Sequence, residues 1–306
     1  MNHQTGETFE KKYKLNEKIG AGCMGTCYSG SRKSNIDNEN PEELCIKIVR
    51  EYADYEAPPE EQATIKARMI VNEVRRSIQT NHIPNIPEIY DWGTFHTHQR
   101  EREDQIISFA VFPRIPGENL LNYCKTHNAE DKKLPEDLVL DIAAQVTTIL
   151  GKMHQQNILH RDIKPENIMW DHQARQVHLV DLGMTSDIDP QTKKLQFPED
   201  ENHLIGTFSV MSPEQAKCKN DLVGTQTEFF NLGATLYTLL AGRPPYQGDN
   251  KFELMINAQD LYHPALSKTI SKSMRQFIQG LMHRRIKKRP SSAQEILDQI
   301  KKLQWK

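Results

Sequence analysis

The chain has 306 residues, 37% of them hydrophobic and 26% charged, with a formal net charge of -2 at pH 7. This length allows one domain with two cooperating lobes, and the apolar content is sufficient for packed cores. The nearly balanced charge argues against nucleic-acid binding and against membrane attachment by bulk charge. No stretch reaches about 18 apolar residues and the start carries no apolar run, so neither a membrane span nor a secretory signal is expected.

The cysteines and histidines indicate a reducing compartment without a zinc site. The chain has 5 cysteines, an odd number without regular spacing, and no pair of them has the C-x-x-C spacing. Free thiols in the cytoplasm are therefore expected. The 12 histidines also lack the spacing of metal ligands.

The first half of the chain is predicted to form β-strands and one helix. Short runs rich in β-forming residues are bounded by glycine, asparagine or charged clusters, which is the pattern of strands. The predicted strands are residues 13–20, 26–31, 44–49 and 106–112, and the predicted helix is residues 61–79. Polar segments at residues 33–43, 50–62 and 95–104 are expected to form solvated loops, with partner contacts as the alternative.

The second half is predicted to be helical. Residues 136–156 place apolar side chains at steps of three and four, which makes one amphipathic stripe. Residues 227–240 are apolar nearly all round, as in a buried central helix, and residues 273–282 and 293–303 are two further predicted helices. A strand-rich first part and a helix-rich remainder predict an α+β protein with two lobes.

A run of glycines near the N-terminus indicates a phosphate contact. The stretch IGAGCMGTCY places Gly20, Gly22 and Gly25 in the pattern G-x-G-x-x-G. Glycine lets the backbone adopt positive φ and approach a phosphate closely, although a plain tight hairpin is the alternative. The chain continues into a predicted strand and not into the helix of a dinucleotide fold, so a glycine hairpin covering a nucleotide fits better.

One lysine lies inside an apolar strand. Lys47 belongs to LCIKIV, and a buried ammonium needs a counter-charge or an anionic ligand. Glu73 in the predicted helix is the candidate partner, and the pair would aim Lys47 at phosphate oxygens. The alternative is a lysine at a sheet edge, with its stem packed and its head in water.

The stretch NILHRDIKPENIMW, residues 157–170, sets a charged core between two apolar pieces, as in a loop held between packed elements. Asp162 can accept a proton from an attacking hydroxyl, and Lys164 can neutralise a migrating phosphoryl group. Asn167 and, in DLG after the strand QVHLV, Asp181 offer oxygen atoms, which Mg²⁺ prefers. These residues together could seat a metal–triphosphate complex and a nucleophile.

With these motifs the chain resembles the eukaryotic-type protein kinase family. The glycine run, L-C-I-K, H-R-D-I-K-P-E-N and D-L-G match that family's signatures in order, and Ser212-Pro213-Glu214 matches the end of its activation segment. Arg289 in KKRP resembles the arginine that family members pair with this glutamate. The stretches HRDIKPEN, GTFSVMSPEQ and LLAGRPPY are most similar to bacterial members of the serine/threonine class.

The resemblance implies a bilobal protein-kinase fold over residues 13–303, preceded by a tail at residues 1–12. A small β-rich N-lobe with one helix would span about residues 13–112. The hinge would span about residues 113–117, and a larger α-helical C-lobe about residues 118–303.

The implied activity is transfer of the γ-phosphoryl group of ATP, with Mg²⁺, to Ser or Thr hydroxyls of protein substrates. Asp162 would be the base, and Thr207 would bridge it to Lys164. These last two residues favour Ser and Thr over Tyr as acceptors. Lys47 and Glu73 would complete the catalytic set.

The implied nucleotide site uses both lobes' motifs. ISFAVFPRIPGENL resembles the strand and hinge that hold adenine, with Phe112 at the back of the pocket, a carbonyl from Pro113 and an N–H from Ile115. Cys27 and Cys45 stand where the family has valine and alanine over the adenine ring. They are interpreted as apolar fillers, and block of ATP binding by their oxidation is the alternative hypothesis. The remaining nucleotide-binding residues are Gly20, Gly22, Gly25, Lys47, Asn167 and Asp181, of which Asn167 and Asp181 would hold Mg²⁺.

The chain departs from the family pattern at Leu182, which replaces a phenylalanine, and at Glu228, which replaces an aspartate. The longer side chain of Glu228 would either loosen its support of the catalytic loop or reach differently. Arg161 indicates regulation by an activation-loop phosphate. One of the acidic residues 199–201 is hypothesised to pair with Arg161 in its place, with a solvated acidic loop as the alternative.

Two other functions stay open at this point: a pseudokinase acting as a binding or scaffold module, and a small-molecule kinase. The presence of Lys47, Asp162 and Asp181 favours a catalyst, and Lys164 favours a protein kinase. The basic run at residues 283–290, apart from Arg289, is expected to be solvated. The cytoplasm is the expected compartment, or a host cell if the protein is an exported effector. The sequence fixes neither the substrate nor the oligomeric state.

Overall fold

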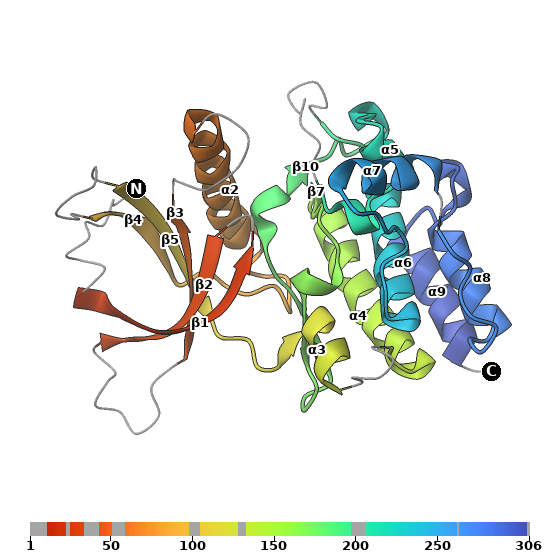
Figure 1. Ribbon diagram of the computed structural model, residues 1–306, viewed down its shortest axis with the longest axis horizontal. Helices are drawn as coiled ribbons and strands as arrows, with labels where there is room; N and C mark the ends of the chain where they lie inside the picture. Colours follow the sequence, from red (N-terminus) through yellow and green to blue (C-terminus); the bar gives the residue numbers. More distant parts are fainter. Residues whose placement is uncertain are drawn as a thin grey trace. The chain divides into compact units, whose positions relative to one another are not determined.

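The computed structural model describes residues 11–22, 25–33, 43–50, 59–97, 105–127, 133–196, 206–261 and 263–304. Its contacts divide the chain into two compact units. The N-terminal unit comprises Met1–His82, Ile86–Ile115 and Asp181–Gly183, and the C-terminal unit comprises Ile83–Asn85, Pro116–Val180 and Met184–Lys306. One unit is rich in strands and the other in helices, which confirms the expected α+β class with two lobes (Figure 1).

The N-terminal unit is an antiparallel sheet with one long helix. The strand order is β1-β2-β3-β5-β4, so that β1 and β4 are the edges. Each pair of neighbours is antiparallel. The elements are β1 (Tyr13–Gly22), β2 (Gly25–Arg32), β3 (Leu44–Arg50), α2 (Pro59–Thr80), β4 (Asp91–Thr97) and β5 (Gln105–Pro113).

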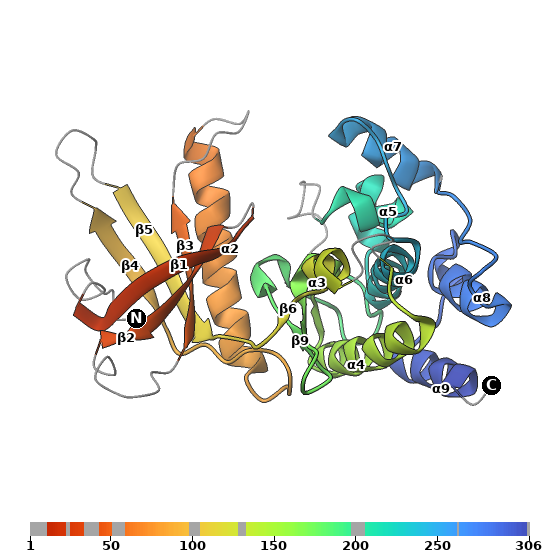
Figure 2. The same ribbon diagram turned by 60° about the horizontal axis from the view of Figure 1, so that its bottom comes forward.

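Alternation along β3 gives the sheet two different faces, because successive side chains of a strand point to opposite sides. Leu44, Ile46 and Ile48 pack in one apolar cluster, together with side chains of β1 and β5. Val49, on the other face, packs with Ile70 of α2. The helix therefore covers the face that also carries Lys47, as the views in Figures 1 and 2 show for the helix and the sheet.

The face of helix α2 that packs on the sheet carries both apolar and polar side chains. Ile70, Glu73, Ser77 and Thr80 are buried at steps of three and four, while Val71 on the opposite side is 62% exposed. The helix extends beyond its predicted bounds of residues 61–79 by two residues at its start and one at its end.

Strand β4 corrects a sequence prediction. Residues 95–104 were expected to form a loop, but Phe95, His96 and Thr97 continue β4 and pair with β5. The neighbouring strand supplies the hydrogen bonds of this edge, so the polar sequence DWGTFHT needs no strong alternation of its own. Likewise, Pro59 to Gln62 belong to α2 and not to a loop. The rest of the three predicted loops, apart from Lys33, Glu43 and Arg50 at their ends, lies outside the described residues.

The C-terminal unit is built on helices with two small sheets. Its strands are β6 (Glu118–Asn119), β7 (Ile158–Leu159), β8 (Ile168–Asp171), β9 (Gln176–Leu179) and β10 (Ser186–Asp187), in the orders β6-β8-β9 and β10-β7. Its α-helices are α3 (Leu120–His127), α4 (Glu136–Gln155), α5 (Pro213–Ala216), α6 (Thr225–Ala241), α7 (Lys251–Asp260), α8 (Lys272–Leu281) and α9 (Ala293–Gln304). The short 3-10 helices are η2 (Pro165–Asn167), η3 (Leu182–Met184), η5 (Phe208–Val210), η6 (Asn220–Leu222) and η7 (Ile286–Lys288).

Helix α6 is the central helix of this unit, as predicted. Fifteen of its residues are buried, and they run almost continuously from Thr225 to Leu240. It ends at Gly242, whose φ of 70° is the left-handed conformation that glycine adopts without strain. Helices α4 and α8 both pack on α6, and α9 packs on α4 (Figure 2).

Two short segments belong to a different unit from the residues that flank them in the sequence. Ile83–Asn85 follows α2 but belongs to the C-terminal unit, where the backbone oxygen of Asn85 accepts from the Leu179 N–H at 2.9 Å. Asn85 Nδ2 also donates to the backbone oxygen of Val177 at 2.6 Å. Conversely, Asp181–Gly183 belongs to the N-terminal unit. Among the described residues, no helix combines the length and the apolar character needed to cross a membrane.

Candidate active site

The sheet and helix of the N-terminal unit bring together Lys47, Glu73 and Asp181. Lys47 Nζ lies 2.7 Å from Glu73 Oε2 and 2.9 Å from Asp181 Oδ1. Lys47 is 7% exposed and Glu73 is 3% exposed, so the alternative of a lysine with its head in water is wrong. One buried ammonium thus joins a carboxylate from α2 to the carboxylate of the DLG triplet.

Burial and the neighbouring charges shift the pKa values of Lys47 and Glu73 in opposite directions. Burial disfavours the ammonium of Lys47, but the carboxylates of Glu73 and Asp181 outweigh burial and raise the pKa of Lys47. Burial raises the pKa of Glu73 to about 7, although Lys47 opposes this effect. Lys47 is therefore a permanent cation, whereas Glu73 titrates close to neutral pH.

The DLG triplet is also held through its backbone. Asp181 has a φ of 68°, in the left-handed region that residues other than glycine rarely adopt. Two residues later, the backbone oxygen of Gly183 accepts a hydrogen bond from Asn72 Nδ2 at 3.0 Å. Asn72 precedes Glu73 on α2, so one helix contacts the triplet both directly and through Lys47.

The glycine run forms the hairpin between β1 and β2. Gly20 and Gly22 lie in β1, and Gly22 pairs with Gly25 at the start of β2. Gly25 has a φ of 141°, and a Cβ there would lie 2.6 Å from the backbone oxygen of Ile48. Only glycine fits this position without a shift of β3. Residues 23 and 24 lie outside the described residues.

Cys27 and Cys45 lie on the same face of the sheet as Lys47. Cys27 pairs with Lys47, and Cys45 precedes Lys47 by two residues on β3. The two thiols share a hydrogen bond, which together with burial raises the pKa of Cys27. The same bond and the Lys47 ammonium lower the pKa of Cys45 against the effect of burial. Both cysteines are half-buried and reduced, and the oxidation hypothesis stays a prediction.

The predicted hinge residues lie at the end of β5 and directly after it. Phe112 packs at the edge of the apolar cluster between the sheet and α2, and Pro113 pairs with Leu44 at the end of the ladder. The next backbone N–H, of Arg114, donates to the Glu43 oxygen at 3.1 Å. Ile115 is the last residue of this segment of the N-terminal unit and is half-buried.

The C-terminal unit brings Asp162, Lys164, Asn167 and Thr207 together. Asp162 is 3% exposed, and its carboxylate lies 2.7 Å from Lys164 Nζ and accepts from Thr207 Oγ1 at 2.7 Å. Lys164 Nζ donates to the same hydroxyl at 3.0 Å. Asn167 Nδ2 donates to the backbone oxygen and to Oδ2 of Asp162, at 2.9 and 3.0 Å. The amide thereby has a fixed orientation, with its carbonyl oxygen as the atom not used on Asp162.

Glu228 does reach the loop that carries Asp162. Its Oε1 accepts from the backbone N–H of Arg161 at 2.6 Å, and its Oε2 lies 2.6 Å from His154 Nε2. Arg161 has a φ of 69°, so this buried carboxylate supports a strained turn directly before Asp162. The longer side chain therefore supports the loop, and it uses His154 of α4 as a second contact.

The side chain of Arg161 contacts the segment that follows the DLG triplet. Its Nη1 donates to Ser186 Oγ at 2.7 Å, and Ser186 begins β10, which pairs with β7. The hypothesis of a pair with one of residues 199–201 lies outside the described residues and stays a prediction.

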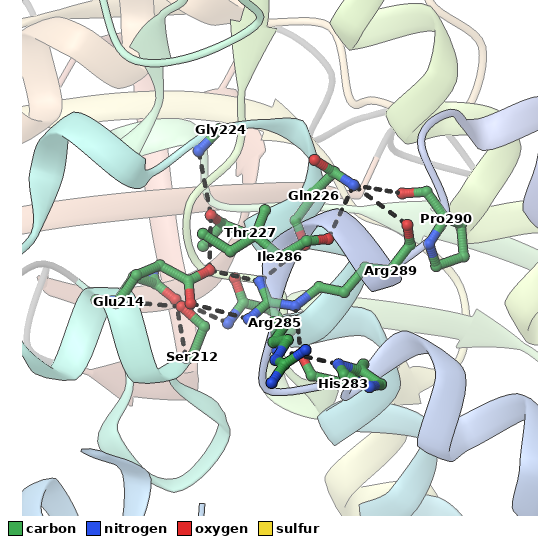
Figure 3. Close-up of polar contacts among 12 residues, drawn as sticks. Ser212, Glu214, Gly224, Gln226, Thr227, His283, Arg285, Ile286, Arg289 and Pro290 are labelled. Atoms are coloured by element: carbon green, nitrogen blue, oxygen red, sulfur yellow. Dashed lines mark hydrogen bonds and ion pairs between the residues drawn. The ribbon is translucent and has the colours of Figure 1, made fainter. Parts of the chain in front are cut away.

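A buried ion pair closes the end of the same segment. Glu214 and Arg289 form a bidentate ion pair (Figure 3). Arg289 Nη1 donates to Glu214 Oε1, and Nη2 donates to Oε2 at 2.9 Å. Thr227 Oγ1 donates to Glu214 Oε1 at 3.0 Å, and Arg289 Nε donates to the His283 backbone oxygen at 2.8 Å. The Arg289 guanidinium also lies 4.7 Å from the ring centre of Phe230. The pairing that the resemblance implied is therefore present.

Two contributing residues escaped the sequence analysis: Asn72 and His154. Each forms a tertiary hydrogen bond, with Gly183 and with Glu228 respectively. Their spacing carries no signal of a site. Only the position of Asn72 next to Glu73 could have drawn attention to it. No group of three or more His, Cys, Asp or Glu side chains suited to a metal ion occurs in the described part of the chain.

Comparison with known families decides the assignment. The model of the protein kinase domain family matches residues 13–305, which is nearly the whole chain. This chain belongs to the protein kinase domain family. The match covers both units, and the strand-rich and helix-rich units agree with the bilobal protein-kinase fold.

Relatives of this kinase domain are named serine/threonine-protein kinases. A probable one from Clostridium acetobutylicum is 25% identical over 298 residues, 96% of this chain and 40% of the relative. PrkC of Bacillus subtilis is 27% identical over 285 residues, 93% of this chain and 39% of PrkC. Kinase dkf-2 of Caenorhabditis briggsae is 27% identical over 292 residues, 94% of this chain and 22% of that kinase. The chain therefore resembles the serine/threonine class, including bacterial members, and spans less than half the length of these relatives.

Proposed function

We propose that the chain is an active serine/threonine protein kinase, which transfers the γ-phosphoryl group of ATP to Ser or Thr hydroxyls of protein substrates. The arrangement around Asp162 carries the proposal. Its carboxylate is buried, yet it is bound by an ammonium, a hydroxyl and an amide. Those three contacts fix the direction of the carboxylate, as a base for a bound hydroxyl requires.

The available oxygen donors fit a nucleotide with Mg²⁺. Asn167 presents a carbonyl oxygen, since its Nδ2 is committed to Asp162. The Asp181 carboxylate, held by Lys47, would be the second oxygen ligand of the metal. Mg²⁺ is a hard cation that prefers such donors and keeps several waters, and it would neutralise charge on the phosphates.

The other residues position the nucleotide and the acceptor. Lys47, oriented by Glu73, would bind phosphate oxygens, and the glycine hairpin would cover them. Asp162 would take the proton of the Ser or Thr hydroxyl while its oxygen bonds to the γ-phosphorus and ADP leaves. Lys164, held by Thr207, would balance the charge on the moving phosphoryl group.

The adenine contacts and the domain bounds are part of the same proposal. Cys27, Cys45 and Phe112 would line the adenine site, with backbone contacts from Pro113 and Ile115. The kinase domain would span about residues 13–303, with an N-lobe at residues 13–112, a hinge at residues 113–117 and a C-lobe at residues 118–303. The names of the relatives support Ser and Thr as acceptors.

The test is autophosphorylation with γ-labelled ATP and Mg²⁺, beside Asp162→Asn. The wild type is expected to carry label on Ser or Thr, and loss of the base should lower the rate by about 10²–10⁴-fold. Asp221→Asn is the matched control, because it makes the same chemical change on an exposed aspartate of the same unit that lies outside the candidate site. Bound ATP without label would contradict the proposal, as would label found only on small-molecule acceptors.

A further inference from the structure

Asn72 joins the long helix of the N-terminal unit to the backbone of the DLG triplet. Its side-chain amide donates to the backbone oxygen of Gly183 at 3.0 Å. The next residue, Glu73, binds Lys47, which in turn binds the carboxylate of Asp181. Two consecutive residues of α2 therefore act on the two ends of one triplet.

The two contacts restrain different parts of the triplet. The ion pair with Lys47 holds only the side chain of Asp181, whereas the Asn72 amide holds the peptide group two residues later. The backbone between these points is strained, because Asp181 has a φ of 68°. Such a conformation persists only where surrounding contacts determine it.

Helix stability gives no reason for an asparagine at this position. Asn72 lies in the interior of the 22-residue helix α2, and asparagine is a poorer helix former than alanine. Its amide competes with the helix backbone for hydrogen bonds. Here, the amide instead bonds outside the helix, to Gly183. Replacement by alanine should therefore leave the helix at least as stable.

We propose that Asn72 is a positioning residue, which holds the Asp181–Gly183 backbone in the conformation that presents the Asp181 carboxylate to Mg²⁺. The part that concerns Mg²⁺ rests on the proposed function, whereas the restraint on the triplet does not. Because Asn72 and Glu73 are adjacent, a displacement of α2 would release the backbone and the side chain of Asp181 together.

The first test needs no nucleotide. Amide hydrogen exchange is measured on a peptide that spans the triplet, in wild type, Asn72→Ala and Val71→Ala. Val71 is the matched control, since it neighbours Asn72 on the same helix but is 62% exposed. Loss of one hydrogen bond should speed exchange of the triplet about threefold to tenfold in Asn72→Ala and leave it unchanged in Val71→Ala.

The second test measures Mg²⁺-dependent binding of a non-hydrolysable ATP analogue. In Asn72→Ala the Mg²⁺ concentration for half-saturation should rise about threefold to tenfold. Affinity for the analogue without Mg²⁺ should not change, and the melting temperature should stay equal or rise. A purely structural role would instead lower the melting temperature and leave the Mg²⁺ dependence unchanged.

The outcomes separate the two proposals. Faster exchange together with a higher Mg²⁺ requirement supports the role of Asn72. Unchanged exchange, or an unchanged Mg²⁺ requirement in a protein that binds the analogue, overturns it while the kinase proposal stands. If the wild type does not bind the analogue with Mg²⁺, the proposed function fails, and the exchange experiment still decides whether Asn72 restrains the triplet.

Discussion

Arg289→Ala should destabilise the C-terminal unit strongly, because it leaves a buried carboxylate without its counter-charge. The side chains of Arg289 and Glu214 are 0% and 4% exposed in their ion pair. Within the described part of the chain, removal of the guanidinium leaves Glu214 with Thr227 Oγ1 as its remaining side-chain donor. One neutral hydroxyl does not compensate a buried negative charge.

The expected loss follows from this burial. Breaking a buried ion pair from one side costs about 3–5 kcal/mol in free energy of unfolding. For a domain of this size, each kcal/mol lowers the melting temperature by about 2–4 °C, so a fall of about 6–20 °C is expected. Activity should fall as well, since Glu214 follows Ser212 at the end of the segment that carries Thr207.

Thermal and urea unfolding of three variants would test this reasoning. Arg285→Ala is the matched control, because Arg285 is exposed on the same loop and should change stability by less than about 0.5 kcal/mol. The double variant Glu214→Leu with Arg289→Met removes both charges and should lie closer to wild type than Arg289→Ala. A loss below about 1 kcal/mol in Arg289→Ala would refute the argument that charge burial dominates here.

Two further predictions concern the site itself. Glu228→Ala removes the carboxylate that accepts from the Arg161 N–H and contacts His154, so kcat should fall about tenfold to a hundredfold with little change in KM for ATP. Steady-state kinetics would measure this change. Glu228→Gln keeps an acceptor oxygen and should therefore lose less activity. Glu73 has a pKa of about 7, so kcat/KM for ATP should fall as pH decreases through 7, because a neutral Glu73 no longer orients Lys47. The same shift predicts that its contribution to stability falls as pH rises from 4.5 to 7, since the folded state there binds more protons than the unfolded state. In Glu73→Gln both pH dependences should disappear, and their persistence would assign them to another group.

Helices with a clear hydrophobic pattern in their own sequence were predictable. The amphipathic stripe of α4 and the apolar surface of α6 gave both helices to within two residues at their ends. Strand β4 and helices α3 and α7 were missed. β4 is a polar edge strand that depends on its neighbour, and α7 has a single buried residue, Ala258. Their structure is decided by contacts with other elements, such as β5 for β4 and α5 for α7.

The residues of the candidate site also differ in how well the sequence predicts them. The residues that bear charge lie in short motifs, and their grouping within each unit, such as Lys47 with Glu73, follows from those motifs. The supporting contacts do not, because a single hydrogen bond between distant residues leaves no pattern. The reach of Glu228 to both Arg161 and His154 is of this kind. Its length could be read from the sequence, but not what it would contact.

Each unit includes a short segment from the other part of the sequence, and this affects any attempt to express the two units as separate fragments. A fragment that ends at Ile115 would retain the five strands and α2 but lack Asp181–Gly183. Its Lys47 ammonium would be buried beside one carboxylate instead of two. The complementary fragment would lack Ile83–Asn85 and with it the acceptor of the Leu179 N–H.

A cut at Ile115 therefore removes native contacts from both halves. Co-expressed halves would need to reassemble by fragment complementation.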